Sequence, residues 1–161
     1  MAKDLGLFTT TVVGGIGVLI GYFYLFLSKY LKPLAKKFTN KEWKIWSFSV
    51  ILTIVSFLAI IVWFSFYQEL DDWQRDLFYS SLIIFLTGAM IWSLSIFYIK
   101  KFKKHVFLQL PALMLTSLGT LGMLISVVYS TSNWLLITAA SIVLFHHLIF
   151  DNIYWVAIDS R

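Results

Sequence analysis

Five long apolar runs, separated by short polar segments, constrain this chain more than any other feature of its sequence. An α-helix needs about 20 apolar residues to cross the hydrocarbon core of a bilayer, and each run is long enough. We therefore predict an all-α, polytopic integral membrane bundle, with residues 1–161 forming a single transmembrane domain. Its five transmembrane helices are expected at residues 5–27, 45–67, 77–99, 108–129 and 134–155.

The composition agrees with a bilayer as the solvent. Of the 161 residues, 60% are hydrophobic and 13% are charged, whereas about a quarter of the residues in a soluble domain are charged. The net charge of +5 comes mainly from lysines in short loops, so it does not indicate binding of nucleic acid. The sequence contains no cysteine, which excludes disulfides and thiolate metal ligands. The sequence thus predicts a multi-pass membrane protein without identifying the membrane.

The charges of the loops predict an orientation. Lysines gather in residues 28–44 and 100–104, whereas residues 69–76 are acidic. Because cytoplasmic loops of membrane proteins are enriched in lysine and arginine, we expect the two basic segments on the inner side and the acidic loop on the outer side. Five crossings then place the N-terminus outside and the C-terminus inside.

The acidic loop could collect cations at a pore mouth or bind a divalent ion through oxygen ligands. A solvated outer loop, with an aspartate capping the next helix, explains the same residues without a ligand. We favour the second interpretation because the calcium-loop spacing and its glycine are missing. The carboxylates of this loop belong to Glu69, Asp71, Asp72 and Asp76.

Small residues recur in the first, third and fourth apolar runs. In lipid, small side chains allow the backbones of two helices to approach closely. For the first run we favour packing within the chain over a seam between two copies. The fourth run carries two strips of small residues and is therefore expected to be central. The glycines predicted at helix contacts are Gly14, Gly17, Gly21, Gly88, Gly119 and Gly122.

Residues 144–155 are the stretch that places ionisable groups inside an apolar run. On an α-helix, His147 and Asp151 lie one turn apart on the same face, whereas His146 points about 100° away. An ionisable residue within the membrane suggests a functional site because it is costly to leave in lipid. The candidate polar site consists of His146, His147, Asp151, Asn152 and Tyr154.

Several interpretations of this site stay open. Asp151 could orient His147 toward a metal or haem iron, the pair could relay protons, or it could contact another subunit. Alternatively, Asp151 and Asn152 reach the headgroups or a lysine, while the histidines satisfy backbone or hydroxyl groups. A metal site needs at least three ligands, and outside this run the sequence offers His105 as the only further histidine and no carboxylate within another apolar run. A self-contained metalloenzyme is therefore not expected, a site shared with a partner subunit stays open, and the sequence assigns neither a metal nor a cofactor.

No catalytic motif is recognisable in the sequence. We therefore favour a non-catalytic integral membrane protein, an accessory or structural subunit of a larger membrane complex. Its partners would be the lipid bilayer and either other membrane subunits or further copies of the chain. The alternative is a small oligomeric channel or transporter that uses His147 and Asp151 for proton or cation handling. A third interpretation is a membrane metal or haem enzyme subunit.

Overall fold

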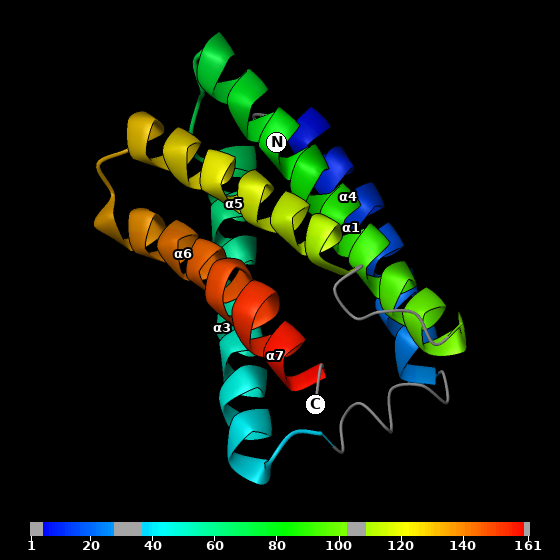
Figure 1. Ribbon diagram of the computed structural model, residues 1–161. Coiled ribbons are helices and arrows are strands. Elements are labelled where there is room, and N and C mark those ends of the chain that lie inside the picture. Colours follow the sequence, from blue (N-terminus) through cyan, green and yellow to red (C-terminus); the bar gives the residue numbers. More distant parts are fainter. Residues whose placement is uncertain (1–4, 28–36, 103–108, 160–161) are drawn as a thin grey trace.

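The computed structural model describes residues 5–27, 37–102 and 109–159, and within these ranges it is built from helices without a strand. The last three helices follow one another without a break and make one continuous helical rod (Figure 1). The described residues therefore form five such rods. The all-α bundle predicted from the sequence is confirmed. In chain order the helices are α1 (Leu5–Leu27), α3 (Asn40–Phe66), α4 (Asp72–Phe102), α5 (Leu110–Ser130), α6 (Trp134–Phe145), the π-helix η2 (His146–Trp155) and α7 (Val156–Asp159).

Polar residues just outside the apolar runs start several of these helices. At α3, Thr39 Oγ1 accepts a hydrogen bond from the Glu42 backbone N–H, and Glu42 Oε2 accepts one from the Thr39 N–H at 2.8 Å, which makes a capping box. At α6, Asn133 Oδ1 accepts from the Leu135 N–H at 3.0 Å. These caps satisfy backbone donors that have no partner inside the helix. As a result, α3 begins before the apolar run that identifies it.

α5 lies between α4 on one side and the continuous α6–η2 rod on the other (Figure 1). α1 packs along α4 and also touches α3, while α3 crosses behind α6 and reaches η2. The position of α5 agrees with the central place expected for the fourth apolar run. The segment that carries the candidate polar site is therefore held from two sides, by α5 and by α3.

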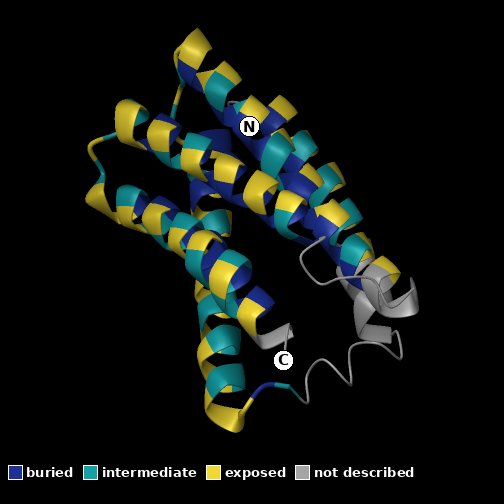
Figure 2. Cartoon of the chain, in the orientation of Figure 1, coloured by how far each residue is buried: buried dark blue, intermediate teal, exposed yellow. Residues whose placement is uncertain are grey.

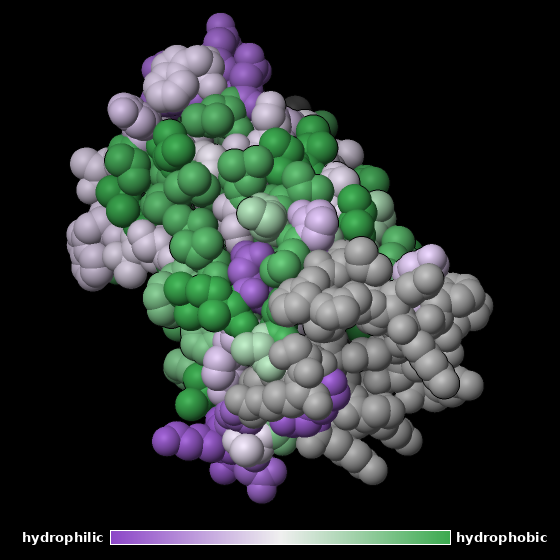
Figure 3. Space-filling view, viewed as in Figure 1, coloured by the Kyte–Doolittle hydropathy of each residue, from purple (hydrophilic) through white to green (hydrophobic). Residues whose placement is uncertain are grey.

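The outer surface of the bundle is apolar. Large side chains such as Val13 and Phe48 are 65% and 69% exposed, and exposed residues alternate with buried ones along every helix (Figure 2). Hydrophilic side chains gather toward the two ends of the visible face, and mainly hydrophobic ones lie between them, around a small hydrophilic patch at the centre (Figure 3). A soluble protein does not tolerate such a surface.

Among the described residues, four helical segments are long and apolar enough to cross a membrane, and residues Leu5–Val18 of α1 form a shorter apolar stretch. Together with the apolar surface, these lengths support a multi-pass membrane protein. The four segments are Asn40–Phe66, Asp72–Ile96, Leu110–Ser130 and Trp134–Trp155.

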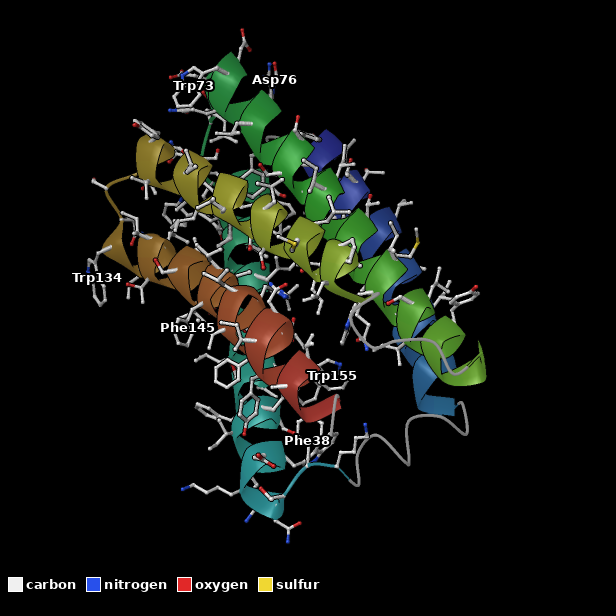
Figure 4. All side chains as sticks on the ribbon, viewed as in Figure 1. Phe38, Trp73, Asp76, Trp134, Phe145 and Trp155 are labelled. Carbon is white, nitrogen blue, oxygen red and sulfur yellow. The ribbon has the colours of Figure 1, made fainter. Side chains whose placement is uncertain are left out.

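An aromatic cluster packs around Trp155, the last residue of η2. Trp155 points toward Phe38, which precedes α3 (Figure 4), and the two ring centroids are 5.4 Å apart. Trp92 meets Trp155 edge-on at 5.4 Å. Gln109 Oε1 accepts from the indole N–H of Trp92 at 3.1 Å and from that of Trp155 at 3.3 Å. These contacts fix the C-terminal end of η2 against α3, α4 and the start of α5.

Candidate functional site

The side chains of His146, His147 and Asp151 form a buried polar cluster in η2. Their exposed fractions are 4%, 8% and 4%. His147 Nδ1 lies 2.7 Å from Asp151 Oδ2, within hydrogen-bond distance, and His146 Nε2 lies 3.5 Å from Asp151 Oδ1. The carboxylate thus lies between two imidazoles, and we call these three residues the His–His–Asp cluster.

The prediction that His146 faces away from Asp151 is wrong. It assumed an α-helix, whereas residues His146–Trp155 form a π-helix. In a π-helix the backbone hydrogen bonds join residues five apart in sequence, so residue i comes close to residue i+5. His146 and Asp151 have this spacing. Short π-helical turns are frequent at functional sites.

Two other helices position the histidine rings. Ser49 Oγ of α3 lies 2.8 Å from His146 Nδ1, within hydrogen-bond distance, which leaves Nε2 of the same ring on the side of Asp151. The Phe85 ring of α4 meets the His147 ring edge-on, with centroids 5.1 Å apart. The histidine rings also meet each other edge-on at 5.1 Å. Residues of α3 and α4 therefore hold both imidazole rings in place.

Asn152 ties the π-helical turn to α5. Its Nδ2 donates to Ser117 Oγ at 2.5 Å and to Leu113 O at 3.3 Å, and also to His147 O at 2.8 Å within η2. Tyr154, the remaining residue of the predicted site, is partly buried. Its ring packs edge-on against Phe150, with centroids 5.9 Å apart.

Several polar atoms of this segment are buried without a hydrogen bond. They are Nε2 of His147, Oδ1 of Asp151 and Oδ1 of Asn152. A buried polar atom without a partner costs about 1–3 kcal/mol, and a charged one costs more. One donor atom from each member of the His–His–Asp cluster lies within 4.8 Å of the others. Chemically, this arrangement suits a small cation, which would satisfy the unpaired lone pairs.

The inclusion of His146 changes the ligand count. The sequence predicted too few ligands for a self-contained metal site because the other apolar runs supply no histidine or carboxylate, whereas the structure brings three donors together within η2. Among the residues that the structure describes, the His–His–Asp cluster is the group of histidine and acidic side chains close enough to share an ion.

Glycines of α4 and α5 lie at close helix crossings. A Cβ atom at Gly119 would lie 2.5 Å from the backbone N of Phe85, and one at Gly88 would lie 2.7 Å from the backbone N of Thr116. A Cβ at Gly122 would meet the side chain of Ser81. Larger residues at Gly88 and Gly119 would push the backbones of α4 and α5 apart.

The glycines of α1 have more open surroundings. A Cβ at Gly14 would meet Leu86 of α4, but one at Gly17 has only Met90 Sδ nearby, at 3.9 Å, and one at Gly15 has no atom within 4 Å. The surroundings of Gly21 lie outside the described side chains. A groove runs between α1 and α4 beside Gly14, lined by Thr9, Thr10, Val13, Gly14, Ile83, Leu86 and Thr87.

The acidic loop is solvent-exposed and lies at the start of α4. Asp72 is in the first helical turn and pairs with Arg75, a position in which the helix dipole favours a negative charge. Trp73 and Asp76 extend from the same end of α4 (Figure 4). Glu69 and Asp71 are exposed as well. This loop is distant in the chain from the His–His–Asp cluster and supplies none of its donors.

The sequence did not single out three polar residues that form hydrogen bonds in the site or its surroundings. They are Ser49, Ser117 and Gln109. Each is a polar residue in or beside an apolar run, and that was the available signal. Serines are common in membrane helices as packing residues, so their pattern alone does not separate a site contact from an ordinary one.

No protein-family model matches this chain, and no curated protein or solved structure is significantly similar to it.

Proposed function

We propose that this multi-pass membrane protein is an accessory or structural subunit of a larger membrane complex and joins its partner along α1. The observation that carries this proposal is the open small-residue surface of α1 beside the groove between α1 and α4. Apolar surface gains little when one membrane helix meets another, because lipid is equally apolar. Association instead depends on close backbone approach, which glycines permit.

The glycines of the chain differ in how they are used. A Cβ atom at Gly88 or Gly119 would collide with the neighbouring helix, whereas a Cβ atom at Gly15 would have no atom of another segment within 4 Å. The groove between α1 and α4, which Gly14 lines, is mainly apolar, with three threonines, Thr9, Thr10 and Thr87, among its lining residues. A transmembrane helix of another subunit, lying along α1, fits this surface.

Gly15→Leu tests the proposal without disturbing the chain itself, because the new side chain begins in open space. The tagged chain would be extracted gently from its native membrane, and the copurifying proteins identified by mass spectrometry. We expect a membrane partner with the wild type, its loss with Gly15→Leu, and no decrease in the thermal stability of the isolated chain. Val128→Leu, at a 48% exposed position of α5, is the matched control and should retain the partner.

Two results would contradict the accessory role. One is equal recovery of the partner with Gly15→Leu and the wild type. The other is a wild-type chain that purifies alone or only with further copies of itself, which would indicate an autonomous protein or a homo-oligomer.

Cation transport is the second candidate function, and the burial of the His–His–Asp cluster favours it. An ionisable cluster inside a membrane helix marks ion pathways in many transport proteins. Purified chain in proteoliposomes should then conduct a cation, with flux lost in Asp151→Asn and retained in Asp72→Asn, which removes an exposed carboxylate. Absence of flux in the wild type would exclude this function.

A further inference from the structure

We infer that His146, His147 and Asp151 bind one first-row divalent transition-metal ion, of the class that includes Zn²⁺ and Fe²⁺. This inference goes beyond the accessory role and does not depend on it, since a bound ion would suit a subunit or a transporter. It rests on the convergence of the three side chains, on their burial and on the atoms they leave without partners.

The donor atoms already lie close to the spacing that an ion requires. Ligands about 2.0–2.2 Å from a zinc ion are roughly 3.0–3.5 Å from one another. His146 Nε2 and Asp151 Oδ1 are 3.5 Å apart, and the full set spans no more than 4.8 Å. Small side-chain rotations would therefore bring all three donors to coordination distance.

The unpaired atoms point to a cation as the missing partner. Asp151 Oδ1 and His147 Nε2 are both buried without a hydrogen bond. Among the described residues, the basic groups within ion-pair distance of Asp151 are the two histidines. A divalent ion bound by Asp151 Oδ1 would compensate the buried carboxylate and give this oxygen a partner, which removes its desolvation cost.

The surroundings hold the ligands as protein metal sites usually do. A metal-binding histidine generally has its second ring nitrogen fixed by a hydrogen bond, which orients the ring. Ser49 has this role at Nδ1 of His146, with a distance of 2.8 Å. At His147, Nδ1 is the ring nitrogen that faces Asp151, 2.7 Å from Oδ2, so Nδ1 is the donor atom that can share an ion with the carboxylate. The π-helical turn brings His146 and Asp151 to the same place.

The donor types select the metal. Two imidazoles with one carboxylate suit zinc, iron, cobalt, nickel or copper, and this triad with open positions is known from non-haem iron and zinc sites. Mg²⁺ and Ca²⁺ prefer oxygen ligands throughout. Because the sequence contains no cysteine, thiolate ligands do not compete. We therefore expect Zn²⁺ to bind and Mg²⁺ not to displace it.

The test uses the full chain in detergent, purified with a tag that contains no histidine and stripped with a chelator. Equilibrium dialysis against Zn²⁺, followed by elemental analysis, should give one ion per chain. Asp151→Asn, His146→Gln and His147→Gln should each weaken binding by more than about tenfold, and Ser49→Ala by about tenfold, the range expected for an orienting residue. His105→Gln removes the third histidine of the sequence and is the matched control, with unchanged binding.

A second measurement needs no variant and covers the case in which a substitution prevents folding. X-ray absorption of zinc bound to the wild type should show two imidazole ligands at about 2.0–2.1 Å. The inference is overturned if the folded wild type shows no saturable Zn²⁺ binding, if the bound zinc has no imidazole ligand, or if Asp151→Asn folds and binds as tightly as the wild type.

Discussion

His146 Nε2 lies 3.5 Å from Asp151 Oδ1, although the two residues are five apart in sequence. On an α-helix they would be separated by roughly 140° around the axis. In the π-helix of residues His146–Trp155, residues five apart in sequence lie much closer to the same face of the helix. Asp151 therefore lies beside both histidines, and either imidazole can interact with its carboxylate.

This relationship predicts energetic coupling between His146 and Asp151. In a double-mutant cycle, His146→Gln and Asp151→Asn should deviate from additivity by about 0.5–3 kcal/mol, as expected for residues in contact. Thermal unfolding in detergent gives the four stabilities. Asn133→Ala, at the opposite end of the same rod, should combine additively with Asp151→Asn. Additive behaviour of His146 and Asp151 would indicate that the π-helical register is not maintained in solution.

The glycine contacts predict opposite effects of alanine at two positions. Gly119→Ala places a methyl group 2.5 Å from a backbone nitrogen of α4, so it should lower the free energy of unfolding by about 1–3 kcal/mol. Gly15→Ala meets no atom within 4 Å and should raise the stability of the isolated chain by up to about 1 kcal/mol, because alanine favours helix. Comparison of the unfolding midpoints would reveal a wrongly placed helix crossing if the order were reversed.

Gln109 should stabilise the aromatic cluster through its side-chain oxygen. That oxygen accepts from the indoles of Trp92 and Trp155 in a fully buried position. Gln109→Leu keeps the apolar volume but removes the shared acceptor, so we expect a loss of about 1–3 kcal/mol. Trp73→Phe, at a 51% exposed position, should change stability by less than about 0.5 kcal/mol. A neutral Gln109→Leu would mean that the indoles find other acceptors at no cost.

The predicted orientation can be measured by labelling, because the natural chain contains no cysteine. Cysteines at Asp72 and Ser132, both exposed, should react with an impermeant reagent added to intact cells. A cysteine at Lys41, also exposed, should react only after the membrane is opened. The reverse pattern would place the N-terminus inside, contrary to the charge bias of the loops.

The apolar runs by themselves determined the helical architecture of this protein. A helix satisfies its own backbone in lipid without help from other segments, so run length and loop chemistry suffice. The contact between His147 and Asp151 was predictable for the same reason, since a spacing of four residues is local to one helix. The sequence placed His146 in the candidate site but did not predict its contact with Asp151, because that contact requires the π-helical turn.

Tertiary structure decided which apolar faces meet and which histidine joins the site. In lipid, an apolar side chain can face either a neighbouring helix or the bilayer, so the sequence does not distinguish a glycine at a close helix crossing, such as Gly119, from one in open surroundings, such as Gly15. The donors of Asn152 reach Ser117 and Leu113 on α5, and Ser49 comes from α3. These contacts between segments distant in the chain stabilise the π-helical turn. Such turns are rare, and no local sequence pattern predicts this one. The geometry of the His–His–Asp cluster therefore depends on long-range packing, which the linear sequence does not display.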